Sequence, residues 1–334
     1  MNRREVIKLG VASIAATGSL ASFGGFSALA QTKMVLKASD VHPLGYPTVE
    51  AVVRMGKKLE EATNGRLSIQ MFPAMQLGGE KEMIEQAQVG ALELARISVG
   101  AVGTVVKELN VFNMPFIFRD ENHMRKVIDG EIGKELLEKI STAPETRLIG
   151  LCWMDAGTRN VYTKKPIRKP EDLTGLKIRM MGNPIFVDTM NAMGGNGISM
   201  GFSELYSAMQ TGVVDGAENN TPTYVTHNHH QIAKYFSFTE HLIIPEILVF
   251  SRVVWEKLSP EDQALIKKLA AEAQQEQRQL WDAMVKESME KLQAAGVTFV
   301  TDVDKEAFRA AIKPVYDKYG AEYAEMIQRI QAVQ

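Results

Sequence analysis

The stretch Pro170-Glu171-Asp172-Leu173-Thr174-Gly175-Leu176-Lys177-Ile178-Arg179 leads into a short apolar strand and ends on an arginine. A second arginine, Arg159, lies on the other flank of segment 166–178, and Asp215-Gly216-Ala217-Glu218-Asn219-Asn220 closes the region. An arginine presents five donors in a planar fork that fits a carboxylate, and it stays charged when partly buried. The region therefore predicts a clamp for a small carboxylic acid.

Outward from this region, short apolar strands alternate with helical segments along the chain. The spacing predicts strands at 34–38, 67–71, 92–98, 147–153, 177–180 and 248–254, and helices at 49–63, 80–89, 122–128 and 203–211. Such a rhythm is typical of α/β proteins, in which helices cover both faces of parallel-rich sheets. We expect an α/β fold.

A long helix is predicted after Ser259-Pro260-Glu261-Asp262, which combines an N-cap residue, a proline at the first helical position and acidic residues in the first turn. Apolar residues recur at helical spacing from Leu265 to Leu292, and Gly296 ends the pattern. A helix of roughly 36 residues is about 54 Å long. Because this exceeds the width of one small lobe, we expect the helix to span two lobes.

The first thirty residues have the pattern of an export signal. Arg3, Arg4 and Lys8 precede an apolar run that is interrupted by glycines and ends in Ala28-Leu29-Ala30, which predicts cleavage after Ala30. The arginine pair resembles a twin-arginine signal, although an ordinary secretory signal is also basic. No later segment has about 18 uninterrupted apolar residues, so we expect a periplasmic protein without a transmembrane span.

Charge and cysteine content exclude other classes of protein. Removal of residues 1–30 takes three basic groups and one acidic group from totals of 38 and 40, which leaves a net charge of −4. A nucleic-acid binder would need clustered positive charge, so we expect none. Cys152 is the only cysteine, and an internal disulfide is therefore impossible. About 300 residues exceed one compact unit, which favours two lobes.

Taken together, these motifs resemble the solute receptors of tripartite ATP-independent periplasmic (TRAP) transporters, of the dicarboxylate-receptor (DctP) type. The resemblance lies in segments 170–179 and 202–219, in Gln76-Leu77-Gly78-Gly79-Glu80 and in Gly157-Thr158-Arg159, and it covers essentially the whole mature chain. It implies a two-lobed periplasmic binding fold, with lobe one at 31–156 plus 246–285 and lobe two at 157–245 plus 286–334. It also implies a monomer that delivers its ligand to membrane permease subunits and needs no cofactor.

The resemblance implies roles for three residues. The position of Arg179 holds the substrate carboxylate, that of Arg159 supports it, and that of Asn219 adds a hydrogen bond. From the residues themselves, either arginine could instead pair with a neighbouring acid such as Asp155 or Glu218.

The loop 40–48 and Glu80 are expected to supply the opposite wall of the site, because their groups accept or exchange hydrogen bonds as sugar hydroxyls require. Arg96 could hold a second carboxylate, but its orientation on the strand is open. The runs 40–49 and 178–184 resemble the branch associated with hexuronates such as glucuronate and galacturonate. The full set of predicted ligand contacts is Arg179, Arg159, Asn219, Glu80, His42, Asp40, Tyr46, Phe202, Ser98 and Asn183.

Other ligands and functions remain as alternatives. The acid could be an aldonate, a dicarboxylate, a keto acid or an aromatic acid. His227, His229 and His230 would be the best metal group of an enzyme, but adjacent histidines in a polar stretch are usually solvated, and no catalytic motif accompanies them. Cys152 lies in an apolar strand and is a poor nucleophile. We therefore expect neither catalysis nor a bound metal.

Overall fold

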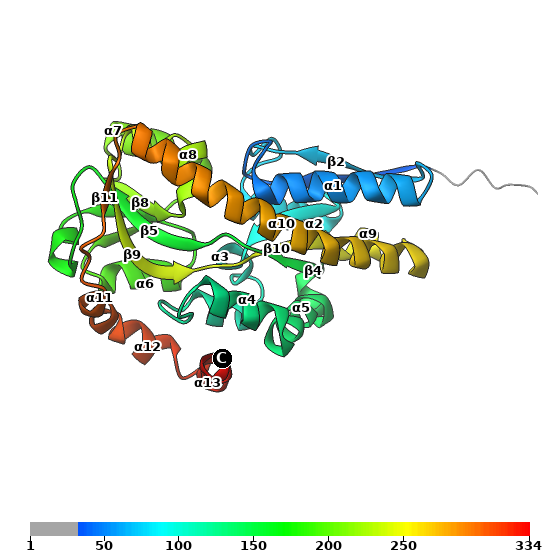
Figure 1. Cartoon of the computed structure of the whole chain (residues 1–334). Helices are drawn as coiled ribbons and strands as arrows, with labels where there is room; N and C mark the ends of the chain where they lie inside the picture. Colours follow the sequence, from blue (N-terminus) through cyan, green and yellow to red (C-terminus); the bar gives the residue numbers. More distant parts are fainter. Residues whose placement is uncertain (1–32) are drawn as a thin grey trace, which may run out of the picture. The chain divides into compact units, whose positions relative to one another are not determined.

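The computed structural model describes residues 33–334. The predicted export signal lies outside the described residues. Two mixed sheets carry the fold (Figure 1). The first has five strands in the order β2 (Leu67–Phe72), β1 (Met34–Ser39), β3 (Leu94–Ser98), β10 (Glu246–Ser251), β4 (Leu148–Met154). The second has six, in the order β11 (Thr298–Val300), β9 (Tyr235–Ile243), β5 (Thr158–Thr163), β8 (Gly216–Asn219), β6 (Lys177–Met180), β7 (Asn196–Ser199).

Helices pack on both sheets. The five-stranded sheet carries α1 (Pro47–Ala62), α2 (Glu80–Val89), α3 (Val99–Val102), α4 (Glu121–Asp129), α5 (Glu131–Thr142), α9 (Arg252–Trp255) and the short turns η1 (Lys107–Asn113) and η2 (Pro144–Thr146). We call this the first half. The second half is the six-stranded sheet with α6 (Pro184–Ala192), α7 (Leu205–Thr211), α8 (Thr221–Thr226) and the turns η3 (Pro170–Leu173), η4 (Phe202–Glu204) and η5 (His229–Gln231).

Three crossings join the halves, the third of them through α10 (Pro260–Ala294), which leads from the first sheet to β11 of the second. The chain leaves the first sheet after β4 and enters the second at β5, and it returns between β9 and β10. In the first sheet β10 lies between β3 and β4 and pairs antiparallel with both, and in the second β5 pairs antiparallel with β8 and β9, so each sheet mixes parallel and antiparallel strands. The predicted α/β class is confirmed, although the antiparallel pairs make the sheets less parallel than the strand rhythm suggests.

The long helix α10 (Pro260–Ala294) contacts both halves. Ser259 Oγ accepts a hydrogen bond from Asp262 N at 3.1 Å, which caps its first turn as the sequence predicts. The helix packs against α1 and β4 of the first half and against α8 of the second (Figure 1). The predicted helix that spans both halves is therefore present.

One side chain of α10 fixes the first crossing. The amide of the buried Gln277 donates to Asp155 O and accepts from Asp155 N, both at 2.8 Å. Two hydrogen bonds to one residue hold this backbone against the helix. Close by, Gly157 has φ +62°, and a Cβ there would lie 2.8 Å from Trp281. The turn therefore needs glycine for its backbone and for the approach of Trp281.

The chain ends in α11 (Lys305–Ala311), α12 (Lys313–Tyr319) and α13 (Ala324–Ala332). Helix α12 packs on α6, whereas Arg329 of α13 pairs with Glu135 of α5 at 2.8 Å. The end of the chain thus contacts both halves. The lobe boundaries proposed from the sequence stay a prediction.

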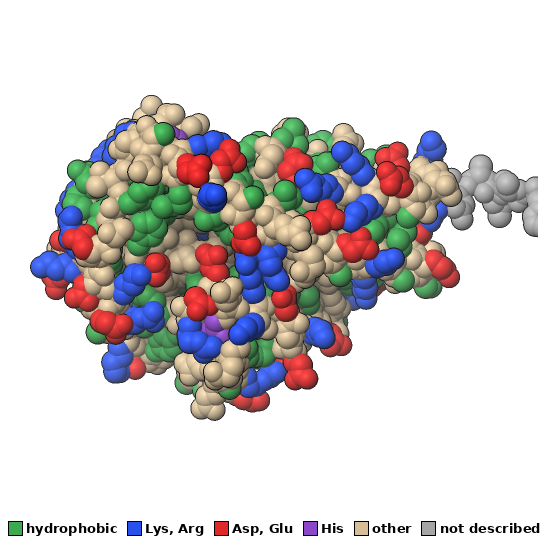
Figure 2. Space-filling model, in the orientation of Figure 1, with side chains coloured by type: hydrophobic (Ala, Val, Ile, Leu, Met, Phe, Trp, Pro, Cys, Tyr) green, Lys and Arg blue, Asp and Glu red, His purple; other side chains and the backbone are tan. Residues whose placement is uncertain are grey.

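The apolar core runs between the sheets. Its largest cluster includes Ile97 and Ile247 from the first sheet with Ile178 and Leu242 from the second. On the face shown in Figure 2, basic and acidic side chains alternate without a large patch of one sign. Within residues 33–334, no helix is both long and apolar enough to cross a membrane.

Candidate ligand-binding site

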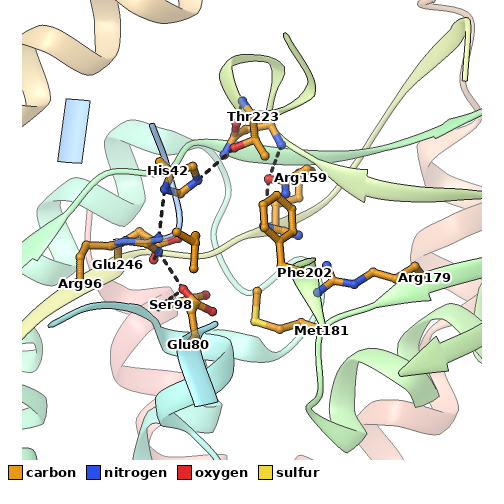
Figure 3. A pocket seen from close by; sticks show the side chains of 13 residues that line it. His42, Glu80, Arg96, Ser98, Arg159, Arg179, Met181, Phe202, Thr223 and Glu246 are labelled. Carbon is orange, nitrogen blue, oxygen red and sulfur yellow. Dashed lines mark hydrogen bonds and ion pairs between the residues drawn. The ribbon is translucent and has the colours of Figure 1, made fainter. Parts of the chain in front are cut away.

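A pocket lies between the two halves and encloses about 380 Å³ of space free of atoms, its opening to solvent included (Figure 3). Its walls are formed by the ends of strands and by the loops that follow these strands. The first half contributes Val41, His42, Glu80, Arg96, Ser98 and Glu246. The second half contributes Arg159, Arg179, Met181, Phe202, Asn219, Asn220 and Thr223.

Arg179 is the pocket cation with the fewest protein partners. It stands on β6 and is only 3% exposed. Its Nε donates to Met200 O at 2.9 Å, and its Cζ lies 5.6 Å from the centre of the Phe202 ring. Within the described chain, its terminal nitrogens have neither a hydrogen bond nor an ion pair. Burial lowers the pKa of Arg179, while Glu218 opposes and Arg159 adds to the effect. A bound anion would compensate the cost of burying this charge.

Arg159 is held by an acid of the chain. From β5, its Nε and Nη2 donate to the two carboxylate oxygens of Glu218 at 2.5 and 2.7 Å. Its Nη1 donates to Asn219 Oδ1 at 3.1 Å. Burial opposes its charge, but Glu218 raises the pKa of Arg159 above its usual value. The sequence left open whether one arginine pairs with a neighbouring acid, and Arg159 does so.

The opposite wall is a cluster of three acids around Arg96, which is 1% exposed. Arg96 Nη2 donates to Asp40 Oδ1 at 2.6 Å, and Nη1 donates to Glu80 Oε1 at 2.8 Å and to Glu246 Oε2. Figure 3 shows Arg96 beside Glu246 and Glu80, across the pocket from Arg179. Three carboxylates thus share the single positive charge of Arg96, which cannot also neutralise a second acidic group of a ligand.

The ionisation of this wall follows from its contacts. Burial favours the neutral form of Asp40, but Arg96 and His42 hold the pKa of Asp40 well below its usual range. Burial lowers the pKa of His42 to about 3, with Arg96 contributing and Asp40 opposing. The ring is therefore neutral, and its Nδ1 lies 2.9 Å from Asp40 Oδ1. Arg96 Nη2 lies 3.0 Å from the same Nδ1, but it already donates to Asp40 Oδ1 at 2.6 Å. We therefore assign the ring proton to Nδ1, toward the ionised Asp40, which leaves Nε2 as an acceptor.

Glu246 behaves differently from Asp40. Burial raises the pKa of Glu246 to about 7, and the neighbouring Glu80 adds to the effect, whereas Arg96 opposes it. At neutral pH this carboxyl is partly protonated. It can then either donate or accept a hydrogen bond, as can the hydroxyl of Thr223.

Most of the predicted contacts line the pocket: Arg179, Arg159, Asn219, Glu80, His42, Phe202 and Ser98. The structure places the other three outside its lining. Asp40 belongs to the acidic cluster of the wall but does not reach the pocket, and it accepts from Arg96, His42 and Thr48. Tyr46 lies behind His42, with the two rings stacked at 3.7 Å. Asn183 caps α6 through Ile185 N.

Val41 lines the pocket as part of the predicted loop 40–48, whereas sequence reasoning missed Met181, Asn220, Thr223 and Glu246 and left the orientation of Arg96 open. A signal existed for the two charged ones. Arg96 and Glu246 each stand in an apolar strand, and a buried charge in such a place needs a partner. Thr223 gave no such signal, because hydroxyls are common at the start of helices.

The groups weighed for an enzyme show no catalytic arrangement. Burial lowers the pKa of His227, and it lowers the pKa of His229 to about 3. His229 Nδ1 is used by Tyr162 OH at 2.8 Å. Burial raises the pKa of the Cys152 thiol to about 12. In the part of the chain that the structure covers, no three His, Cys, Asp or Glu side chains come close enough to share a metal ion.

Comparison with known proteins identifies the relatives of this chain. Residues 38–322 match the family DctP, described as bacterial extracellular solute-binding protein, family 7. A TRAP periplasmic solute-binding protein of Pseudomonas putida F1, solved with D-glucuronate, is 58% identical, with 90% of this chain and 98% of that one covered at a TM-score of 0.88. A protein of Xanthobacter autotrophicus Py2, solved with β-D-galacturonate, is 42% identical, with coverage of 90% and 100% and a TM-score of 0.86.

A third relative has been solved in two states. The TRAP periplasmic solute-binding protein of Citrobacter koseri with D-glucuronate is 50% identical, with coverage of 90% and 100% and a TM-score of 0.88. Its open form without ligand gives a TM-score of 0.79 at 48% identity, with coverage of 89% and 99%. The present structure is thus closer to the ligand-bound arrangement.

These matches confirm the family resemblance seen in the sequence. They also confirm the expectation that the chain is no enzyme, because the family consists of transport proteins that bind solutes. The match includes every residue of the pocket and all strands of both sheets except the first four residues of β1. The chain belongs to family 7 of the bacterial extracellular solute-binding proteins, and it is a periplasmic solute receptor of a TRAP transporter.

Proposed function

We propose that the receptor binds a hexuronate, D-glucuronate or D-galacturonate, and delivers it unchanged to the membrane subunits of its transporter. The observation that carries this proposal is the unequal use of the three pocket arginines. Arg96 and Arg159 are paired with acids of the chain, whereas the terminal nitrogens of Arg179 have no partner within residues 33–334. The pocket therefore has one anion-binding end.

At that end, the ligand carboxylate would bind Arg179, with Arg159 and Asn219 beside it. Arg159 would also orient Asn219, to which it donates at 3.1 Å. Phe202 packs over the Arg179 guanidinium and would face the apolar side of a sugar ring.

The opposite wall favours hydroxyl groups. Glu80, Glu246 and the neutral His42 offer acceptors, and Ser98 offers a hydroxyl. A second carboxylate on the ligand would meet acids that already share one guanidinium, and it would be repelled. Among the acids left open by the sequence, a polyhydroxylated monocarboxylate therefore fits better than a dicarboxylate. The relatives solved with D-glucuronate and galacturonate support the same class of ligand.

The remaining features of the proposal follow from the sequence. Residues 1–30 would direct export, by a twin-arginine or an ordinary secretory route, and be removed after Ala30. The receptor would act as a monomer, without nucleotide, metal or organic cofactor. Lobe one would comprise 31–156 plus 246–285 and lobe two 157–245 plus 286–334, closing on the acid between them. Asp40 and Tyr46 would support the contact made by His42.

Titration calorimetry with matched ligands tests the proposal. D-Glucuronate and D-galacturonate should bind with a stoichiometry of one. D-Glucose, which lacks the carboxylate, should bind at least about 100-fold more weakly, because it leaves Arg179 unpaired. D-Glucarate, which adds a second carboxylate to the glucuronate skeleton, should lose about 10-fold or more. Tighter binding of D-glucarate or succinate than of D-glucuronate would overturn the proposal.

A further inference from the structure

We propose that Tyr46 is a closure residue: its hydroxyl joins the two halves beside the pocket and sets how tightly any ligand is held, without touching the ligand. The inference rests on the proposed function only in that an acid must occupy the pocket. It assigns to Tyr46 a role in the closed arrangement, in place of the direct ligand contact expected from the sequence.

The contact that carries the inference crosses between the halves. Tyr46 precedes α1 of the first half, and Thr223 belongs to α8 of the second half, 177 residues further along the chain. Their hydroxyl oxygens are 2.9 Å apart, and both residues are 1% exposed. Separation of the halves would break this bond and expose both hydroxyls to water.

The surroundings of Tyr46 fix its position. One face of its ring stacks on His42, with an interplanar angle of 4°, and its edge faces Trp281 of α10 at 6.1 Å between ring centres. The ring is thus held between a residue that lines the pocket and the helix that contacts both halves. Its hydroxyl can point only toward α8.

The hydrogen bonds around Tyr46 have one consistent direction. Burial raises the pKa of Tyr46 above its ordinary value, so the hydroxyl keeps its proton. Either hydroxyl can donate in the pair with Thr223, and we assign Tyr46 as the donor, which frees the Thr223 proton. Thr223 Oγ1 lies 3.5 Å from His42 Nε2, to which it can donate in turn. Since His42 donates to Asp40 through Nδ1, the chain of donors runs from Tyr46 to the acidic wall. Closing the halves completes this chain and orients His42.

Because only the closed arrangement makes this bond, its loss should lower the closed population for every ligand alike. Removal of one buried hydrogen bond typically changes an equilibrium by about 3- to 10-fold. The apparent affinity falls by the same factor as the closed population. A residue in contact with the sugar would instead change the preference between two sugars.

The variant that tests the inference is Tyr46→Phe, which removes one oxygen and keeps the ring. Its matched control is Tyr224→Phe, because Tyr224 neighbours Thr223 on α8 but donates to Ala233 O within the second half. Affinity and dissociation rate are measured for D-glucuronate and D-galacturonate. The opening of the halves is followed by pulsed dipolar spectroscopy between spin labels at Lys57→Cys and Gln210→Cys, which are exposed positions of α1 and α7.

Tyr46→Phe should weaken both uronates by the same factor of about 3 to 10, speed dissociation and increase the open fraction at a given ligand concentration. Tyr224→Phe should lower the melting temperature and leave affinity and opening unchanged. A changed ratio of the two affinities would overturn the inference, as would unchanged opening. Should the wild type bind neither uronate, the proposed ligand class fails, and the spectroscopy with whichever acid stabilises the protein still decides the role of Tyr46.

Discussion

At the scale of single residues, two of the three buried arginines of the pocket, Arg159 and Arg179, have opposite relations to stability. Arg159 is neutralised by Glu218, whereas Arg179 has no acid bonded to it within the described chain. Removing one member of a buried ion pair leaves a buried charge and typically costs about 3–5 kcal/mol. Removing an uncompensated buried charge has no such cost. Substitution of Arg179 should therefore reduce ligand affinity but not folding stability, whereas substitution of Arg159 should reduce folding stability.

Arg179→Met should abolish useful binding, with a loss of about 2–5 kcal/mol in binding free energy, while the free protein melts at the same or a higher temperature. Arg159→Met should instead lower the melting temperature sharply, because Glu218 is left alone. Calorimetry and thermal unfolding without ligand measure the two effects. Equal destabilisation by both variants would show that Arg179 serves the fold rather than the ligand.

The raised pKa of Glu246 predicts that the folding stability depends on pH. Its folded-state pKa of about 7 lies above the ordinary value of 4.5, so the folded protein retains this proton when the unfolded chain has lost it. Its contribution to stability is complete below about pH 4.5 and is lost as the pH rises through about 7. Between pH 5 and 8, wild type should lose on the order of 1–3 kcal/mol relative to Glu246→Gln. Urea unfolding of both proteins across this range measures the difference, and parallel curves would contradict it.

Some of the site could be predicted from single residues, and some could not. Alternation along β3 places Arg96 and Ser98 on the same face, so the prediction that Ser98 faces the pocket already implied the orientation of Arg96. Asn183 precedes Pro184, a combination typical of a helix start, and capping is the role that its side-chain oxygen has. The pairing of Glu246 with Arg96 joins residues 150 apart, and no local pattern contains it.

At the scale of elements, the sequence predicted helix starts that are determined by residues close together in the chain. The expected helix after Ser259 is α10, because capping, proline and acidic residues all act within one turn. The strand expected at 248–254 is shifted: β10 is Glu246–Ser251, and Arg252–Trp255 forms α9. The first residues of β10 belong to the crossing between the halves. Glu246 is buried there because it pairs with Arg96, and an apolar sequence pattern does not reveal such a residue.

Gly157 gives a prediction about the crossing between β4 and β5. An alanine at this position would need φ near +62° and would place its Cβ 2.8 Å from Trp281. Gly157→Ala should therefore destabilise by about 2–4 kcal/mol, from backbone strain plus overpacking. Gly296→Ala is the matched control, since its φ is +72° and no atom lies within 4 Å of a Cβ there.

The control variant should lose only about 1–2 kcal/mol, from the backbone alone. Denaturant unfolding of the two variants measures the difference. Equal losses would mean that Trp281 moves aside at no cost, and that α10 does not constrain the crossing.

At the scale of the whole molecule, α10 and the shared core join the two halves. The helix contacts α1, β4 and α8, and the largest apolar cluster draws residues from both sheets. Neither half can unfold without exposing surface of the other. We expect scanning calorimetry to show a single transition whose van't Hoff and calorimetric enthalpies agree.

Ligand should shift this transition as a whole, by about 2.7 kcal/mol at 100 times the dissociation constant. Two resolved transitions, only one of which moves with D-glucuronate, would contradict this view of the molecule. The order of the halves along the chain could be predicted from the family resemblance, but their cooperativity depends on packing that no sequence motif contains.

The Arg179 guanidinium affects measurements of ligand binding to this receptor. A guanidinium with no acid of its own will accept acetate, formate or citrate left over from purification. Titrations in such media would report the displacement of one anion by another, and heats and midpoints would drift with the choice of salt. After dialysis against a medium of large, weakly coordinating anions, the measured affinity for the ligand should increase, although the protein itself is unchanged.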